Sequence, residues 1–439
     1  MNSQKKAIYS WCLYDWANSA FAVTVLAGFF PVFFNNYWCS DVEPTTSTLR
    51  LGVGSTIAGL LIAFFSLFMG AVADAGGGKK RFLFLFMVVG TASTTALYFV
   101  SQGNWLAALS IFILGNIGFS CSDLFYNSLL LDVTDRSTID YVSSMGFACG
   151  YLGCGLLFAV NVLMTIRPQF FGLENEISAV KVSFLTVAAW WLIFSIPIFL
   201  YVKEKVYSAR PPFSSLASHT VKSLKKTAFD IRTNRVLLLF ICAYWLYIDG
   251  LNTFIRMAID FGVSIGFSAS TLMLALLLVQ FVAFPSALVF GQLAFRFGAQ
   301  KMILFGIVIY IAVTGFGTIF LRTDIHFVIL ASLTGLAQGG IQALSRSYFG
   351  KLIPPEKASE YFGFYNIVGR FAVLGPVLVG GVGVIMRKAG VSSNMASRMG
   401  MSSVLVLFAA GGLLLVFAEM ERERTAKIQS EQDVFPVTT

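Results

Sequence analysis

Charged residues are scarce in this sequence, and their scarcity excludes a soluble globular protein. Only 12% of the 439 residues are Asp, Glu, Lys or Arg, whereas 57% are hydrophobic and the mean hydropathy is +0.77. Soluble domains have about a quarter of their residues charged. About twelve apolar spans of roughly 20 residues each would occupy a little over half of the chain. The composition therefore predicts an all-α polytopic membrane protein with that number of transmembrane helices.

Histidine and cysteine are too few and too scattered for a catalytic or metal-binding site. The histidines and cysteines are His219, His326, Cys12, Cys39, Cys121, Cys149, Cys154 and Cys242. They lack the spacing of a metal-ligand set, and no Ser-His-Asp, Cys-His or nucleotide-binding pattern is present. Lone cysteines in apolar segments are ordinarily small apolar side chains. We therefore expect no metal, no cofactor and no enzyme activity.

Acidic residues are outnumbered, with 22 Asp and Glu against 31 Lys and Arg. If the amino terminus is inside, about 22 of the basic residues fall in inner segments and about 7 in outer ones. This asymmetry predicts that both termini are cytoplasmic. The net charge of +9 then reports orientation and some attraction to anionic lipid headgroups, not nucleic-acid binding. The first apolar stretch has no cleavage signal and is expected to be a retained helix.

The apolar segments fall into two sets separated by one long basic connection. The expected spans are 8–36, 48–73, 82–101, 105–131, 140–165, 182–202, 235–260, 269–294, 302–321, 326–349, 360–386 and 399–419. We therefore predict an N-terminal six-helix half (1–202), a cytoplasmic linker (203–234), a C-terminal six-helix half (235–420) and a cytoplasmic tail (421–439). The polar tail is expected to be disordered after a short helical extension. We expect a functional monomer.

Two spans carry an acid where an acid is costly, so each is a candidate functional site. In each, an acid, an amide and a hydroxyl share one helix face at i, i+3 and i+4. The triplets are Asp15, Asn18 and Ser19, and Asp249, Asn252 and Thr253. A carboxylate that alternates between a buried site and water can load and release a proton. Asp249 and Asp15 are the candidates for proton coupling; permanent pairing with a tyrosine, amide or arginine is the structural alternative.

A second repeat follows the second and eighth spans. Three pairs keep one common offset: Gly70 with Gly291, Gly77 with Gly298, and Lys80 with Lys301. Parallel halves are expected of transporters that rock around a central site. Asp74 is expected against the amino-terminal end of the eleventh span, whose dipole favours an anion, and would close the cytoplasmic side. Phe295 replaces this Asp in the second copy, which predicts an asymmetric latch.

Several polar residues within the spans have two interpretations each. Arg256 either binds a substrate carboxylate or reaches the outer interface and pairs with Asp260. Arg370 requires an acid such as Asp249 or an anionic ligand. A polar stripe in the tenth span lines the cavity or forms helix–helix hydrogen bonds, and it consists of Gln338, Gln342, Ser345 and Arg346. Asp123 and Asn127 in the fourth span likewise either line the cavity or form helix–helix hydrogen bonds.

These considerations define two sets of candidate residues. The substrate-binding candidates are Tyr14, Asn18, Asp123, Asn127, Tyr247, Asn252, Arg256, Gln338, Gln342, Tyr365, Asn366 and Arg370. The gating candidates are Gly70, Asp74, Gly77, Lys79, Lys80 and Arg346. The glycines Gly146, Gly150 and Gly153 are expected to allow close helix packing rather than to contact substrate.

The motifs resemble those of a known transporter class. The Gly-x-x-x-Asp loop at 70–74 resembles motif A of the major facilitator superfamily, with Ala75 in place of the usual basic residue. This resemblance implies a fold of two pseudo-symmetric six-helix halves. The stretch Tyr14-Asp-Trp-Ala-Asn-Ser-Ala-Phe21 is similar to the vacuole-effluxer (autophagy-related amino-acid effluxer-like) family. Further stretches that match it are 146–153, 190–197, 247–250, 338–347, 362–366 and 375–376.

The resemblance implies export of small solutes, amino acids in the fungal members, whereas it leaves the cargo of the bacterial-type members open. We expect a bacterial inner-membrane protein that moves a small polar solute by proton-coupled alternating access, with substrate, protons and the bilayer as its partners. An amino acid or similar zwitterion suits the paired acids and arginines. Transport of another metabolite, such as a siderophore, drug or sugar, is an alternative. A non-transporting receptor or scaffold is another, and unchanged flux in every assay after Asp249→Asn would favour it.

Overall fold

The computed structural model describes residues 3–76, 78–205, 207, 213–264, 269–321, 323–370 and 374–434. Within these ranges the side chains of Pro44, 213–215, 256–264, 269–271 and 429–434 lie outside the description. Twelve helical segments in the described part are long and apolar enough to cross a membrane. The predicted number of spans is confirmed, and all of the regular secondary structure in these ranges is helical.

The first half contains six spans. The first span is assembled from four consecutive segments, α1 (Ser3–Ala20), η1 (Phe21–Phe29), α2 (Phe30–Phe33) and η2 (Phe34–Trp38). The other five are α3 (Pro44–Gly76), α4 (Lys79–Leu97), α5 (Trp105–Val133), α6 (Ile139–Ile166) and α7 (Glu176–Tyr201). A short helix, η3 (Pro168–Phe171), joins α6 to α7.

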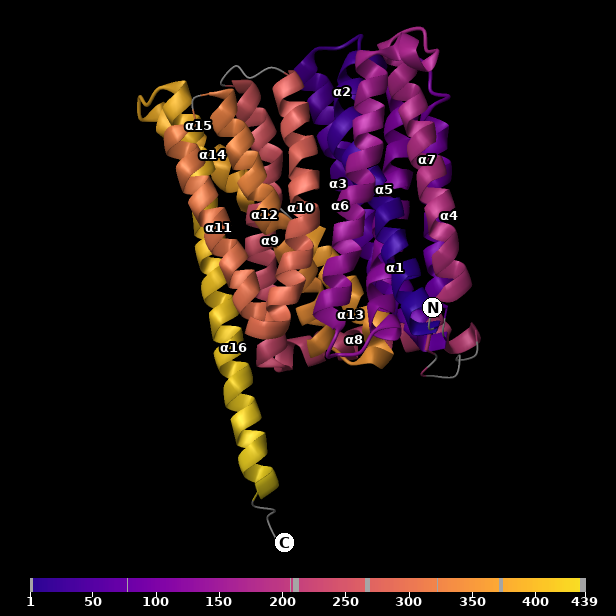
Figure 1. The fold of residues 1–439 in the computed structure, drawn as a ribbon, viewed down its shortest axis with the longest axis vertical. Coiled ribbons are helices and arrows are strands. Elements are labelled where there is room, and N and C mark those ends of the chain that lie inside the picture. The colour runs from indigo at the N-terminus through magenta and orange to yellow at the C-terminus, as the bar shows by residue number, and fades with distance from the viewer. Residues whose placement is uncertain are drawn as a thin grey trace.

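The second half contains the other six. Its spans are α9 (Arg235–Ser264), α10 (Ala269–Phe297), α11 (Ala299–Phe320), α12 (Asp324–Leu352), then α13 (Ala358–Arg370) with α14 (Leu374–Lys388), and α15 (Ser393–Ser402) with α16 (Val404–Val434). A short helix, η4 (Pro355–Lys357), precedes α13. The two halves stand side by side, one indigo to magenta and the other orange to yellow (Figure 1).

The first span departs from α-helical geometry around a proline. Pro31 has no N–H group, so its hydrogen bond to the residue four positions earlier is lost. On either side the backbone bonds reach five residues back, from Phe30 N to Val25 O and from Cys39 N to Phe34 O. The bulky rings fill the widened helix surface, and Phe30 stacks on Phe112 of α5 at 3.9 Å between ring centroids. This span is therefore fixed to its own half by aromatic packing.

The linker and the tail are more helical than expected. The linker contains α8 (Phe213–Thr233), which lies across the end of the bundle where α1, α9 and α13 begin. We call this end the terminal face. Ser223 of α8 donates to Glu360 at 2.8 Å, and Lys357 donates to Thr227 at 3.1 Å. The last helix, α16, continues to Val434 beyond this face (Figure 1), so the expected disorder does not begin soon after Glu419.

The antiparallel helices α3 and α13–α14 of opposite halves touch near the terminal face and diverge away from it. A Cβ on Gly70 would lie 2.6 Å from the Ser359 carbonyl oxygen, and one on Gly363 would lie 2.8 Å from that of Ser66. Farther along, a Cβ on Gly52 of α3 or Gly381 of α14 would meet no described atom within 4 Å. The contacts at Gly70 and Gly363 therefore join the two halves on the terminal side.

Candidate functional site

Asp74 joins the two halves at the terminal face. Its Oδ1 accepts from the backbone N–H of Ser359 at 3.2 Å and its Oδ2 from that of Glu360 at 2.7 Å. The first N–H groups of a helix have no intrahelical acceptor, and the helix dipole favours an anion there. The contact expected from the sequence is thus present, and Gly70, one turn earlier, lets the α3 backbone come close to α13.

The lysines after Asp74 act within the first half. Lys79 forms an ion pair with Asp132 of α5 at 2.9 Å. The Lys80 ammonium donates to the carbonyl oxygens of Phe199 and Val202 at 2.8 and 2.7 Å, at the end of α7. They hold α4 to α5 and α7 in the first half. Gly77, the remaining gating candidate of this loop, lies outside the described residues.

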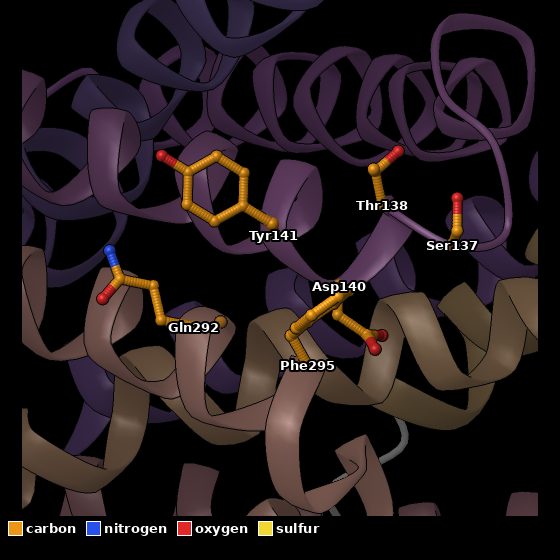
Figure 2. Close-up of a pocket in the computed structure, with 7 residues that line it drawn as sticks. Ser137, Thr138, Asp140, Tyr141, Gln292 and Phe295 are labelled. Atoms are coloured by element: carbon orange, nitrogen blue, oxygen red, sulfur yellow. The ribbon is translucent and has the colours of Figure 1, made fainter.

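The second copy of the loop is built differently. A Cβ on Gly291 of α10 would lie 2.5 Å from Ser144 Cβ of α6, so this glycine allows an equally close approach between halves. Phe295, 81% exposed, takes no part in a polar latch. It lines a cavity of about 350 Å³ together with Asp140 (Figure 2). Lys351 of α12 pairs with Asp140, so here an ion pair links the halves instead of a carboxylate–helix contact.

Asp15 and Arg346 form a buried ion pair across the two halves. Arg346 Nη1 of α12 lies 3.4 Å from Asp15 Oδ2 of α1, and the two side chains are 2% and 9% exposed. Tyr126 donates to the same carboxylate oxygen at 3.0 Å, and Ser19 donates to the other at 2.9 Å. The acid of the first span thus has its charge partner on the opposite half.

Arg346 is inserted into a cradle supplied by the first half. It donates to the Asn127 side chain at 2.9 Å and to the Ser143 hydroxyl and carbonyl at 2.9 and 2.8 Å. Its guanidinium carbon lies 4.2 Å from the centre of the Phe147 ring and 4.8 Å from that of Trp11. A buried guanidinium needs hydrogen-bond acceptors for its N–H groups and an opposite charge nearby, and this cradle supplies both.

The α6 glycines make room for this cradle. A Cβ on Gly146 would lie 2.7 Å from the Tyr126 hydroxyl and 3.1 Å from Arg346 Nη2. One on Gly150 would lie 2.6 Å from Asp15 Oδ1. The expectation that they serve close packing is confirmed, and they pack against the ion pair itself.

Asp249 has a different environment from Asp15, although the sequence places both in equivalent triplets. Its carboxylate is fully buried and accepts from the N–H groups of Leu374 and Gly375 at 2.8 and 3.2 Å, and from Thr253 at 3.2 Å. It therefore binds the start of α14 within its own half. Arg370, suggested as its partner by the sequence, donates to Asn366 at 3.0 Å.

Asn366 and Arg370 of α13 face the first half. Asn366 donates to the Ser66 hydroxyl of α3 at 3.1 Å and to the Ser120 carbonyl of α5 at 3.0 Å. The Arg370 guanidinium lies 5.4 Å from the centre of the Phe119 ring, also on α5. Both substrate-binding candidates are thus brought to the junction of the halves.

Two further groups of candidates lie near this junction. Gln342 accepts from Tyr151 of α6 at 2.7 Å, whereas the Gln338 carbonyl oxygen is buried without a partner among the described residues. Asn127 donates to Asp123 at 3.0 Å. The Tyr14 hydroxyl is also buried without a described hydrogen-bond partner.

Three of the remaining candidates make contacts within the second half. Tyr247 shares a hydrogen bond of 2.7 Å with Ser345, and Asn252 donates to the Gly369 carbonyl at 3.2 Å. Tyr365 stacks on Tyr244 at 4.1 Å. Asn18 is 2% exposed. The side chain of Arg256 lies outside the described residues, so neither of its two interpretations is addressed.

Sequence reasoning missed the residues that complete the Arg346 cradle. Ser143, Tyr126, Trp11 and Phe147 supply hydrogen bonds or ring faces, but serine and aromatic residues are common in membrane helices. The available signal was position: Phe147 lies in the stretch 146–153 that resembles the family, and Ser143 lies three residues before it.

The arrangement of two six-helix halves is shared with solved transporters of the major facilitator superfamily. The human organic anion transporter MFSD10 aligns with a TM-score of 0.68 at 13% identity, over 94% of this chain and 100% of its own. The proton:xylose symporter XylE aligns with a TM-score of 0.64 at 13% identity, over 94% of each chain. A bacterial homologue of ferroportin in an outward-facing state gives 0.62 at 10% identity, over 96% and 100%. The protein thus has the major facilitator fold and is an integral multi-pass membrane protein.

Sequence comparison places it within that class. Residues 46–427 match the family described as vacuole effluxer Atg22 like. An uncharacterized MFS-type transporter of Bacillus subtilis (strain 168), YxiO, is 37% identical over 98% of both chains. Autophagy-related protein 22 of Coccidioides immitis (strain RS) is 22% identical over 94% of this chain and 87% of its own length. The chain therefore belongs to the vacuole effluxer Atg22-like family of major facilitator transporters, as the motifs predicted.

Proposed function

We propose that this transporter moves a small zwitterionic solute, an amino acid or a close analogue, by proton-coupled alternating access. The observation that carries the proposal is the buried Asp15–Arg346 pair, which joins opposite halves on the terminal side. Such a pair must break when the halves separate on the terminal side. It is therefore present in the conformation that is closed on that side and absent from the conformation that is open there. The close approach of α3 to α13 at Gly70 and Gly363 supports closure on the terminal side in the present state.

We propose that the terminal face is cytoplasmic and that Arg346, Asp74 and Gly70 form its gate. All three lie where opposite halves meet. Lys79 and Lys80 would support the gate indirectly, because they hold α4 in place beside Asp74. In a bacterial inner membrane with this orientation, a cycle that binds solute at the terminal side and releases it at the other exports it.

Proton coupling is proposed to reside at Asp15, with Asp249 in support. When the halves separate, Arg346 leaves Asp15, and a carboxylate without its cation in a buried site is best neutralised by a proton. Asp249 would act through the start of α14, which it binds by two backbone N–H groups. Protonation of Asp249 would weaken both hydrogen bonds and free α14 to move.

Uptake into proteoliposomes of a labelled mixture of the protein amino acids, with and without an imposed pH gradient, tests this function. We expect gradient-driven uptake in the wild type and its loss in Asp15→Asn, with a reduced rate in Asp249→Asn. Asp135→Asn, which removes an exposed acid between α5 and α6, is the matched control and should retain uptake. Uptake that ignores the gradient would contradict the coupling, and no uptake by folded protein would contradict the substrate class.

A further inference from the structure

One face of α5 is turned toward the second half along much of its length. Its residues recur at helical spacing, and each contacts a residue of that half. The pairs are Phe119 with Arg370, Ser120 with Asn366, Asn127 with Arg346, and Ser128 with Ser359. Asp123 lies in the middle of this row, one turn from Phe119 and one turn from Asn127.

Asp123 is the exception in this row. Its Oδ2 accepts from Asn127 of its own helix at 3.0 Å, while its Oδ1 accepts no hydrogen bond from the described residues. The side chain is half-buried and forms no direct ion pair with any described residue. The Arg370 guanidinium lies 5.4 Å from the centre of the Phe119 ring, and Phe119 precedes Asp123 by one turn of α5. A carboxylate of the first half thus lies near an arginine of the second without touching it.

The arginine on the opposite side is held in a fixed orientation. Its Nε donates to Asn366 at 3.0 Å, and its guanidinium lies 5.4 Å from the centre of the Phe119 ring. Asn366 is itself held by Ser66 and Ser120 of the first half. Fixed donors of this kind bind a carboxylate with less loss of side-chain entropy than a mobile lysine does.

Asp15 and Asp249, the two acids of the repeated triplets, are already engaged. Asp15 is bound by Arg346, Tyr126 and Ser19, and Asp249 is bound by backbone N–H groups and Thr253. Neither offers a carboxylate to a cationic ligand in this state.

We infer that Asp123 and Arg370 bind the two poles of the substrate: the ammonium lies on Asp123 Oδ1 and the carboxylate on the Arg370 guanidinium. This assignment rests on the proposed transport of a zwitterion. A solute bound this way joins α5 of the first half to α13 of the second. Its binding energy therefore shifts the equilibrium between the conformation with the halves together on the terminal side and the conformation with the halves separated there. A compound with only one of the two charges makes only one of these two contacts and should bind less tightly.

The inference is tested by selectivity in the proteoliposome assay. Uptake of the labelled amino-acid mixture is competed with the unlabelled mixture, with the corresponding carboxylic acids lacking the amino group, and with the corresponding amines lacking the carboxylate. In the wild type the intact amino acids should compete best. Asp123→Asn should raise KM about tenfold or more and remove the advantage of amino acids over the deaminated acids. Arg370→Gln should instead remove their advantage over the amines.

Matched controls separate this result from loss of folding or of function. Asp135→Asn and Arg136→Gln make the same chemical changes in the exposed loop before α6 and should keep wild-type selectivity. If Asp123→Asn or Arg370→Gln is inactive, Asp123→Glu and Arg370→Lys, which retain the charges, should recover part of the uptake. Selectivity unchanged in Asp123→Asn, or changed toward the amines, overturns the assignment while the proposed function stands. Absence of amino-acid uptake in the wild type overturns both.

Discussion

Asp15, Arg346 and Asp249 inside this bundle are held by specific partners rather than left in an apolar environment. Asp15 and Arg346 neutralise each other, and Asp249 accepts from the start of α14. An uncompensated charge at such depth would cost several kcal/mol, so each partner is a requirement of the fold as well as a possible part of the transport cycle. Substitutions at these positions must therefore be measured for stability and for transport separately.

Gly375 should not tolerate a side chain. A Cβ there would lie 1.9 Å from Thr253 Oγ1 and 3.0 Å from Asp249 Oδ1, so Gly375→Ala must displace the start of α14. We expect a loss of at least about 2 kcal/mol of stability, measured as thermal unfolding in detergent. Gly381→Ala, in the same helix but with no described atom within 4 Å, should be neutral or slightly stabilising. Equal effects of the two changes would contradict this account.

The Asp15–Arg346 pair should show strong energetic coupling. Arg346→Gln leaves a buried carboxylate without its cation, and we expect a loss of about 3 kcal/mol. Asp15→Asn combined with Arg346→Gln should cost less than the sum of the two single changes, because neither charge is then left alone. Chemical unfolding of the four proteins measures the coupling. Strict additivity of the two free-energy changes would show that the two side chains do not interact in the folded protein.

Helices α3 and α8 determine how the start of α13 is held at the terminal face. The Asp74 carboxylate of α3 binds the first N–H groups of α13, and Ser223 of α8 binds the Glu360 side chain. The linker thus contacts the same turn of α13 as Asp74 does. A linker that merely connected the halves would not need these contacts, so we propose that α8 moves with α13.

Removing the α8 contacts should loosen this helix without unfolding the bundle. Ser223→Ala with Thr227→Val deletes two hydrogen bonds, each worth about 1 kcal/mol. Hydrogen–deuterium exchange should become faster in α8 and in the first turn of α13, and remain unchanged in α11. Lys222→Ala, on the exposed side of α8, is the control. Unaltered exchange in α13 would show that these α8 contacts do not stabilise the start of α13.

Close approach of α3 to α13 should be required for closure of the terminal face. Gly70→Leu places a side chain where the Ser359 carbonyl now lies, at 2.6 Å from the glycine's ideal Cβ. We expect the variant to favour separation of the halves on this side, seen as faster labelling of a cysteine introduced at Ser128. Gly52→Leu, where the neighbouring space is open, should label like the parent protein.

The halves as whole bodies must move relative to each other if alternating access operates. Ser128 of α5 and Ser359 of α13 come from opposite halves, and their hydroxyl oxygens lie 3.3 Å apart. A double substitution, Ser128→Cys with Ser359→Cys, should form a disulfide on mild oxidation, because the two side chains touch and a small rotation brings the sulfurs to about 2 Å. Uptake should stop on oxidation and return on reduction. Each single cysteine variant should be insensitive, and full activity of the cross-linked protein would exclude the rocking motion.

Much of the fold could be predicted because it follows from local sequence. The spans follow from runs of apolar residues. The Asp74 contact follows from the Gly-x-x-x-Asp motif at 70–74, because the sequence places this Asp against the amino-terminal end of the eleventh span. The candidate site was less predictable. Asp15 and Asp249 have matching neighbours in sequence, yet one binds an arginine of the other half and the other binds backbone of its own. Spacing along a helix defines which residues share a face but not which helix meets that face.

By itself, the sequence determined that this chain spans the membrane, that it consists of two related halves, and that it carries acids and arginines within them. Hydrophobic run length and repeated motifs are local properties, so no tertiary information was needed. Only the tertiary structure decided that Arg346 pairs with Asp15 and that Arg370 lies over Phe119, one turn from Asp123. Those pairings join residues more than two hundred positions apart, and they exist only because the two halves pack against each other.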